Sequence, residues 1–256
     1  MLKDWEFGHL NIFDYKNCKP THHLKLYFDF IKENHDIISG DLCEVGVYKG
    51  WSLLATALFL KEIGSKKKLF GFDSFSGFPP VFHENDNADK FESLFNSNKI
   101  TEQHFADINK RLMMKELINK VNISNGRITS VRNNMEDTNL EILKKKIKFL
   151  NLDNIILVPG PFDDTMSDNQ QYSYLNNITF MAAWLDSDLY NSYKSSLPFV
   201  WGKMQPGGYL YIDEYYSLKY PGCRIAINEF FSDKEEKPEL QFEESMDFER
   251  WCIRKT

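Results

Sequence analysis

The sequence lacks the features of secreted, zinc-binding and membrane-spanning proteins. No C-x-x-C pair occurs among its four cysteines, which disfavours a disulfide framework and a structural zinc site: Cys18, Cys43, Cys223 and Cys252. The longest apolar run, Leu53 to Leu60, includes Thr56 and falls far short of the roughly 20 residues of a membrane span. The N-terminus has acidic residues early and no apolar signal core, so we expect a cytoplasmic protein with free thiols.

The chain also lacks an excess of positive charge. It carries 31 basic and 37 acidic side chains, a formal net charge of −6, which argues against a protein that neutralises nucleic-acid phosphates. Its 256 residues are 42% hydrophobic and 15% aromatic, ample for a buried core. We expect a single domain over residues 1–256.

From residue 41 onward, short apolar runs alternate with helical patterns, as in a parallel α/β sheet. Strands are expected at 41–47, 69–73, 154–158, 179–185 and 208–212, with a closing hairpin at 240–243 and 250–253. Helices are expected at 51–63, 139–150, 192–203 and 223–231. Two segments fall outside this alternation: an aromatic N-terminal extension, 1–40, and a long connection, 75–134. Connections of that length are often functional lids, although a peripheral helical insertion is the alternative.

The first expected strand leads into a turn that contains Glu44, Gly46 and Gly50. Glycines at such a turn let a ligand approach the backbone, and the following helix N-terminus favours an anionic group. The turn is not the G-x-G-x-x-G dinucleotide fingerprint. Glu44 would repel a pyrophosphate but suits an ammonium or sulfonium charge. An ordinary tight turn is the alternative interpretation.

Asp73 lies at the end of the second expected strand. An acid at this place accepts both ribose hydroxyls in nucleotide-binding α/β sheets. The alternative is a turn cap, because Asp-Ser-x-Ser-Gly is favourable turn chemistry. Together with Glu44, the pattern favours ribose.

Acidic residues follow two later strands: Asp186 and Asp188 after the fourth, and Asp213 and Glu214 after the fifth. If the two strands are neighbours, Asp186, Asp213 and Glu214 meet beyond their carboxyl ends. Neither motif contains a basic residue that would neutralise them. Oxygen-only ligation suits Mg²⁺, Mn²⁺ or Ca²⁺ rather than zinc. The alternative is that these acids cap helices.

Other candidates are weaker. His104 lacks metal-ligand spacing with any other histidine and is expected on the surface or in the lid. The basic run 144–148 is expected to be a solvated helix face. No Walker loop and no G-x-S-x-G elbow occurs.

Taken together, these residues resemble the macrocin O-methyltransferase family, metal-dependent enzymes that use S-adenosylmethionine to methylate hydroxyls, often on sugars. The resemblance runs from about residue 41 to 231. It rests on six motifs in order: Glu44-x-Gly46-x-x-x-Gly50-x-Ser52, Phe72-Asp73-Ser-Phe-x-Gly-Phe-Pro79, Val158-x-Gly160-x-Phe162-x-Asp164-Thr165, Leu185-Asp186-x-Asp188-Leu-Tyr190, Pro206-Gly-Gly-Tyr-x-x-x-Asp213-Glu214-Tyr215 and Pro221-Gly-Cys-Arg224.

The resemblance implies a Rossmann-like class I methyltransferase fold, with seven mostly parallel strands and the last one antiparallel. It implies a cofactor site in which Glu44, Gly46 and Ser52 lie along the methionine part. Tyr48 is placed there by the similar turn of catechol methyltransferases. Asp73, with Ser74 beside it, takes the ribose hydroxyls. The adenine is flanked by the turn that contains Gly160, Phe162 and Asp163.

The resemblance also implies Asp186, Asp213 and Glu214 as ligands of Mg²⁺ or Mn²⁺, and Asp186 or Asp188 as the proton acceptor. The family usually has Asp-Asp where this chain has Asp213-Glu214. The acceptor is expected to be a sugar, a glycosylated natural product or a surface glycan.

Two rival functions stay open. Asp186-Ser-Asp188 also fits the D-x-D signature of metal-dependent glycosyltransferases. An inactive cofactor-binding module is the other alternative, since a fold does not prove activity. Further partners are not expected to include nucleic acid or a membrane span, and the N-terminal aromatic segment is a candidate surface for homo-oligomerisation.

Overall fold

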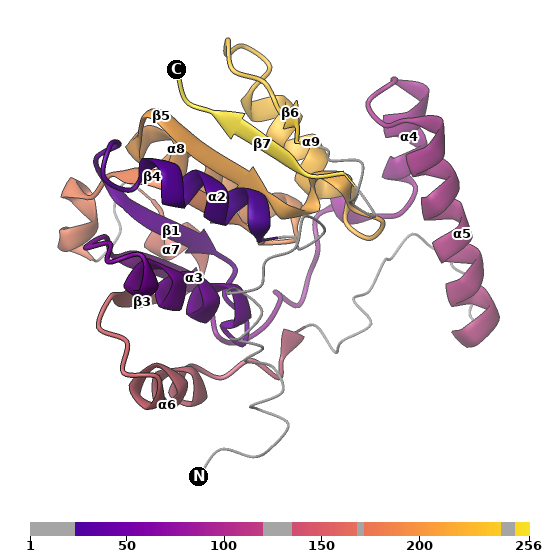
Figure 1. Cartoon of the computed structure of the whole chain (residues 1–256). Helices are drawn as coiled ribbons and strands as arrows, with labels where there is room; N and C mark the ends of the chain where they lie inside the picture. The colour runs from indigo at the N-terminus through magenta and orange to yellow at the C-terminus, as the bar shows by residue number, and fades with distance from the viewer. Residues whose placement is uncertain (1–23, 120–134, 168–171, 242–248) are drawn as a thin grey trace.

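A single seven-stranded sheet forms the centre of the protein in this computed structural model, which describes residues 24–119, 135–167, 172–241 and 249–256 (Figure 1). The strand order is β3-β2-β1-β4-β5-β7-β6. The strands are β1 Asp41–Val45, β2 Leu69–Asp73, β3 Ile155–Pro159, β4 Phe180–Leu185, β5 Met204–Ile212, β6 Glu239–Leu240 and β7 Trp251–Arg254. β1 to β5 pair in parallel, whereas β7 is antiparallel to β5 and β6. The expected Rossmann-like sheet with a reversed last strand is confirmed.

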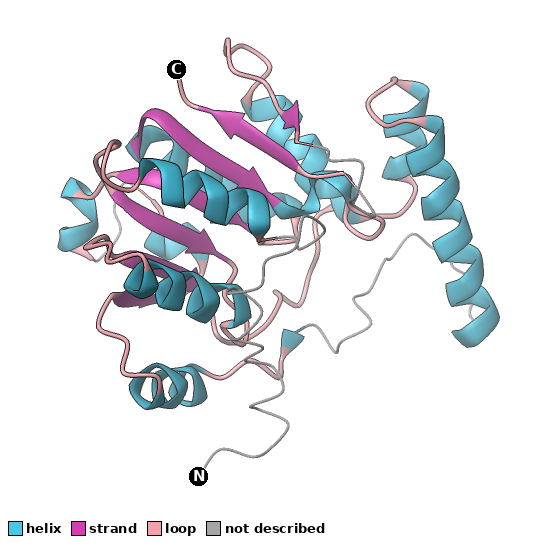
Figure 2. Cartoon of the chain, viewed as in Figure 1, coloured by secondary structure: helices cyan, strands magenta, loops and turns pink. Residues whose placement is uncertain are grey.

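Helices cover both faces of the sheet and make three layers (Figure 2). Because successive strand residues point to opposite faces, Leu42 packs toward one layer while Cys43 and Val45 pack toward the other. The first layer contains α2 Lys25–Asn34, α3 Trp51–Glu62 and α6 Leu140–Phe149. The second contains α7 Phe162–Thr165, α8 Tyr190–Lys203 and α9 Pro221–Phe230. The sheet is thus buried on both sides, as its apolar runs predict.

Local sequence signals explain several helix starts. Gly50 precedes α3 with φ +84°, a conformation that glycine adopts without steric cost. The Asn139 side chain accepts a hydrogen bond from Ile142 N at 3.0 Å and caps α6. Pro221 occupies the first turn of α9, where its missing N–H is not needed.

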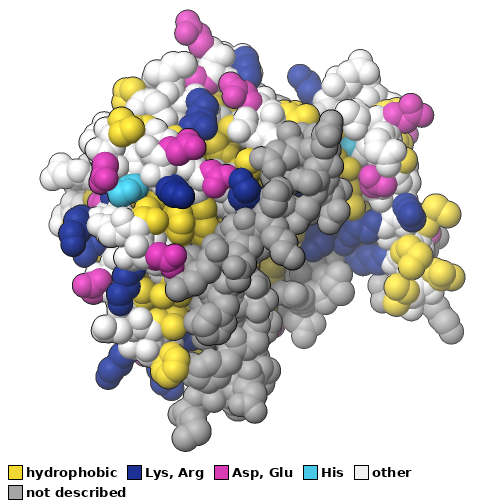
Figure 3. All heavy atoms as spheres, in the orientation of Figure 1, with side chains coloured by type: hydrophobic (Ala, Val, Ile, Leu, Met, Phe, Trp, Pro, Cys, Tyr) yellow, Lys and Arg dark blue, Asp and Glu magenta, His cyan; other side chains and the backbone are white. Residues whose placement is uncertain are grey.

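The connection between β2 and β3 forms a helical insertion beside α9. It contains a short 3-10 turn, η2 Glu84–Asp86, followed by α4 Lys90–Asn96 and α5 Glu102–Asn119. Phe91, Leu94, Ile100 and Ile108 form its own small core. The last two turns of α5 project from the body of the protein and expose four large apolar side chains (Figure 3): Met113, Met114, Leu117 and Ile118.

Two titratable side chains are buried, and one of these burials contradicts the sequence prediction. His104 lies in the predicted lid, one of its two expected places, but it is 2% exposed, and its Nε2 lies 2.9 Å from the carbonyl oxygen of Ser217. Lys146 is also 2% exposed, although it lies in the basic run that was expected to be solvated. Its ammonium donates to the carbonyl oxygen of Lys49 at 3.2 Å. Both burials depend on segments distant in sequence, which a local pattern does not reveal.

Parts of two other predictions concern residues that the structure leaves undescribed. Of the N-terminal extension, residues 1–23 lie outside the described ranges, so the predicted oligomer surface there stays a prediction. The same holds for residues 120–134 of the predicted lid. Among the described helices, none is both long and apolar enough to cross a membrane.

Candidate active site

A pocket of about 780 Å³ opens at the carboxyl ends of the parallel strands. This is the edge at which open α/β sheets bind ligands. Nine of the residues predicted for the site line it: Gly46, Tyr48, Ser52, Asp73, Ser74, Phe162, Asp163, Asp186 and Asp188. The lining does not include four others, Glu44, Gly160, Asp213 and Glu214. Most of the residues predicted from the sequence motifs therefore line one pocket, and only these four do not.

The turn after β1 is held by Asp73. Asp73 Oδ2 accepts hydrogen bonds from the backbone N–H groups of Val47 and Tyr48, each at 2.8 Å. Its other oxygen accepts from Phe75 N at 2.6 Å. Burial raises the pKa of Asp73, and these backbone hydrogen bonds oppose the increase. Asp73 is thus a turn cap that also faces the pocket, so the two interpretations of this residue are compatible.

Gly46 allows β1 and β4 to approach closely at their ends. Its φ is +90°, and a Cβ atom there would lie 1.8 Å from the carbonyl oxygen of Asp186. No side chain fits in this space. The glycine therefore brings the first turn directly against the loop that carries Asp186 and Asp188.

Glu44 lies behind this turn and is 1% exposed. It accepts a hydrogen bond from the Ser52 hydroxyl at 2.7 Å, and Ser52 lines the pocket. Burial raises the pKa of Glu44 well above its ordinary value, the hydrogen bond from Ser52 lowers it, and the charge of Asp186 raises it further. In this structure Glu44 acts on the pocket through Ser52.

Three carboxylates gather at the ends of β4 and β5. One oxygen each of Asp186, Asp188 and Glu214 lies within 4.8 Å of the other two. Asp188 has φ +60°, which turns the chain sharply after β4. Glu214 accepts a hydrogen bond from the Tyr193 hydroxyl of α8. The expected meeting of acids from two neighbouring strands is present, but this trio contains Asp188 where the sequence hypothesis has Asp213.

Burial dominates the electrostatics of the cluster. It raises the pKa of Asp188 and of Glu214 well above their ordinary values, and the neighbouring carboxylates raise both further. The pKa of Asp213 rises to about 8 through burial and the charge of Asp186, while Arg250 and Lys219 oppose the change. The side chains of Arg250 and Lys219 lie outside the acidic motifs, so the motifs alone did not predict these positive charges near Asp213. Buried like charges with oxygen donors are the chemistry that a hard divalent cation satisfies.

The remaining walls come from three other parts of the chain. Pro161, Phe162 and Asp163 line the pocket at the start of α7, and Gly160 precedes them with φ +140°. The insertion contributes Phe78, Pro79, Pro80 and Val81 at its start and Met135 and Thr138 at its end. Trp51 and the first turns of α8 complete the lining. Phe78 and Pro79 belong to the second quoted motif, whereas Pro80, Val81, Met135 and Thr138 lie outside all six motifs, and only the length of the connection indicated that such residues line a pocket.

Comparison with known proteins identifies relatives of this chain. The macrocin O-methyltransferase (TylF) family description matches residues 22–153 and 88–242. Demethyldecarbamoylnovobiocin O-methyltransferase of Streptomyces niveus is 24% identical over 75% of this chain and 58% of that protein. Mycinamicin III 3''-O-methyltransferase of Micromonospora griseorubida is 24% identical over 76% of this chain and 61% of that protein. The alignments therefore span about three-fifths of the length of these relatives.

Solved structures show the same fold at low sequence identity. The O-methyltransferase NovP superposes with a TM-score of 0.60 and 20% identity, covering 90% of this chain and 79% of that one. The calicheamicin methyltransferase CalS11 gives 0.58 and 16%, covering 99% and 94%. The family match spans most of the chain and includes every predicted site residue. The chain belongs to the macrocin O-methyltransferase family.

Proposed function

We propose that the chain is an S-adenosylmethionine-dependent O-methyltransferase that methylates a hydroxyl of a sugar, a glycosylated natural product or a surface glycan, with the help of a divalent cation. One observation carries the proposal: the carboxylates of Asp186 and Asp188 line the same pocket as Asp73 and the Gly46 turn. A methyl donor and an acceptor hydroxyl can therefore bind side by side. The two relatives named above are, by their names, O-methyltransferases of demethyldecarbamoylnovobiocin and of mycinamicin III, which supports a natural product as the acceptor.

The pocket provides suitable groups for the cofactor. Gly46, Tyr48 and Ser52 border the space predicted for the methionine part, with the buried Glu44 behind Ser52. Asp73 Oδ2 already accepts two backbone hydrogen bonds, whereas Oδ1 accepts one and has a lone pair left to accept from a ribose hydroxyl. The start of α7 offers the ring of Phe162 for contact with adenine and the Asp163 carboxylate for a hydrogen bond.

The acid cluster fits a hard cation in donor type and charge. Asp186, Asp188 and Glu214 would hold Mg²⁺ or Mn²⁺, and Asp213 is the further ligand that the family motif predicts. When bound, the cofactor supplies an electrophilic methyl group, and the cation lowers the pKa of the acceptor hydroxyl.

The side chains of this chain orient the reactants and accept the proton. Methyl transfer is a displacement, so much of its acceleration comes from holding the acceptor oxygen in line with the methyl group. A carboxylate oxygen of Asp186 or Asp188 is positioned at the pocket surface to take the hydroxyl proton.

The insertion is proposed as the acceptor wall. Its residues Phe78 to Val81 line the pocket and present mainly apolar surface. The predicted lid motion of residues 75–134 is part of this proposal. Hydrogen exchange of residues 75–119 with and without cofactor and acceptor tests it, because protection should increase on binding.

Calorimetry and mass spectrometry test the function as a whole. The chain should bind S-adenosylhomocysteine rather than UDP, and it should transfer a labelled methyl group to a member of a sugar and glycoside panel only with Mg²⁺ or Mn²⁺. Asp186→Asn should abolish transfer and keep S-adenosylhomocysteine binding. Asp153→Asn, at an exposed acid before β3, is the matched control. Binding of UDP alone would indicate a glycosyltransferase, and cofactor binding without transfer to any acceptor would indicate an inactive module.

A further inference from the structure

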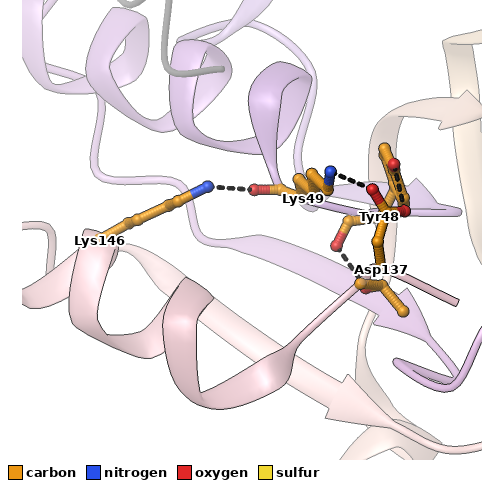
Figure 4. Close-up of polar contacts among 5 residues, drawn as sticks. Tyr48, Lys49, Asp137 and Lys146 are labelled. Carbon is orange, nitrogen blue, oxygen red and sulfur yellow. Dashed lines mark hydrogen bonds and ion pairs between the residues drawn. The ribbon is translucent and has the colours of Figure 1, made fainter. Parts of the chain in front are cut away.

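Asp137 joins the end of the insertion to the turn that follows β1. The Tyr48 hydroxyl donates to Asp137 Oδ1 at 2.5 Å, and the Lys49 ammonium pairs with Asp137 Oδ2 (Figure 4). One residue later, the Thr138 hydroxyl donates to the carbonyl oxygen of Tyr48 at 2.8 Å. Both carboxylate oxygens of Asp137 are therefore used to hold two consecutive residues of the turn.

The two segments that Asp137 joins both line the pocket. Tyr48 lies on the turn and lines the pocket together with Met135 and Thr138, and Thr138 is bonded to Tyr48 directly. Tyr48 and Met135 have φ values of +51° and +59°, a region that side chains other than glycine rarely adopt. Such backbone persists only where the surrounding contacts fix it. The contacts of Asp137 and Thr138 lie between these two positions and provide that restraint.

The turn is held from the other sides by buried groups. Lys146 donates to the carbonyl oxygen of Lys49 from within α6 (Figure 4), and Asp73 accepts from Tyr48 N. The Asp137 side chain differs from these two because 55% of it is exposed. Its ion pair is therefore open to solvent and to salt, whereas the other anchors are shielded.

We propose that Asp137 is a positioning residue of the cofactor site, which fixes Met135 and Thr138 against the first turn and slows the release of bound cofactor. Asp137 does not line the pocket, and its effect passes through Tyr48, whose backbone N–H Asp73 also holds. The inference rests on the proposed function for the identity of the ligand. It adds a residue outside every motif that carries the family resemblance.

The test is the dissociation rate of S-adenosylhomocysteine from the full chain, measured by stopped flow with the fluorescence of Trp51, which lines the pocket. Asp137→Asn should release the ligand about three- to fivefold faster, the range expected for the loss of one exposed ion pair, because the amide oxygen can still accept from the Tyr48 hydroxyl. Glu136→Gln, at the neighbouring exposed acid, is the matched control and should leave the rate unchanged. The melting temperature without ligand should stay close to that of the wild type in both variants.

A double-mutant cycle separates positioning from a general loss of structure. Lys49→Met should also accelerate release, and adding it to Asp137→Asn should have less than the additive effect, because the two side chains act through one contact. Raising KCl from about 0.05 to 1 M should speed release from the wild type and leave Asp137→Asn nearly unaffected.

The outcomes distinguish this inference from the function on which it rests. An unchanged release rate in Asp137→Asn, or an equal acceleration in Glu136→Gln, overturns the positioning role while S-adenosylhomocysteine binding still supports the proposed function. A lower melting temperature with an unchanged release rate assigns Asp137 to folding alone and overturns the inference as well. A wild-type chain that does not bind S-adenosylhomocysteine overturns the proposed function, and the inference with it.

Discussion

Asp86 is a buried carboxylate whose replacement should stabilise the protein at neutral and higher pH. It lies in η2, is 3% exposed, and accepts a hydrogen bond from Tyr190 N at 2.8 Å through Oδ1. Oδ2 makes no hydrogen bond to any described residue. Burial raises the pKa of Asp86 from 3.8 to about 6, although the hydrogen bond from Tyr190 N opposes the change. The charged form is thus costly in the folded state.

The sign of the effect follows from the raised pKa. The contribution of Asp86 to stability is fully present below the unfolded pKa of 3.8 and is lost as the pH rises through about 6. A shift of about 2 units corresponds to at most about 3 kcal/mol at 1.36 kcal/mol per unit, and partial solvation reduces this to about 1–2 kcal/mol. Asp86→Asn keeps the acceptor for Tyr190 N and carries no charge at any pH. Its free energy of unfolding should exceed that of the wild type at pH 8 and approach it near pH 4.

Urea denaturation followed by circular dichroism, at several pH values between 4 and 8, measures this difference. His104 titrates in both proteins, so its contribution cancels in the comparison. Asp89→Asn, at an exposed acid of the same segment, is the control and should show no such trend. A difference between Asp86→Asn and the wild type that does not change with pH would refute the reasoning.

Two further substitutions at the site and one in the insertion follow from the contacts described above. Gly46→Ala should lower the free energy of unfolding by about 3 kcal/mol or more in urea denaturation, because its Cβ would lie 1.8 Å from the carbonyl oxygen of Asp186. Asp73→Ala should cost about 2–4 kcal/mol of stability by leaving three backbone N–H groups without their acceptor, and calorimetry should show weaker S-adenosylhomocysteine binding. Burial lowers the pKa of His104 to about 4, so the wild type should lose stability as the pH falls from about 6.5 to 4. His104→Gln should remove that loss in the same assay, and an unchanged acid sensitivity would contradict it.

Much of the sheet was predictable because a strand buried on both faces is a continuous apolar run. The bounds of β2 match the prediction, and the acids after β4 and β5 meet because the carboxyl ends of neighbouring parallel strands share one edge. The start of β5 was predicted at residue 208 but lies at Met204, because Pro206 and Gly207 look like turn residues in isolation. These two residues extend β5 at its start, where Gly207 N donates to the carbonyl oxygen of Lys255, the residue after β7, at 2.7 Å.

The exact membership of the acid cluster could not be predicted. β4 ends at Leu185, so the alternation of side chains along a strand does not predict where Asp188 points. Asp188 has a left-handed backbone conformation, and its carboxylate lies within 4.8 Å of that of Asp186. The charges of Lys219 and Arg250 reach the cluster from other segments. The contact of Asp137 with Tyr48 joins residues 89 positions apart, which no local pattern encodes.

The insertion between β2 and β3 is bonded to distant segments near both of its ends. Asp86 accepts a hydrogen bond from Tyr190 N near its start, and Asp137 accepts one from the Tyr48 hydroxyl at its finish. Its helices pack on α9 through their own small core, which includes Ile225 at its edge. Changes of length or sequence between these two hydrogen bonds would thus leave the strand register intact. Under the proposed function, exchanging this connection between family members should change the acceptor range while leaving the cofactor pocket intact.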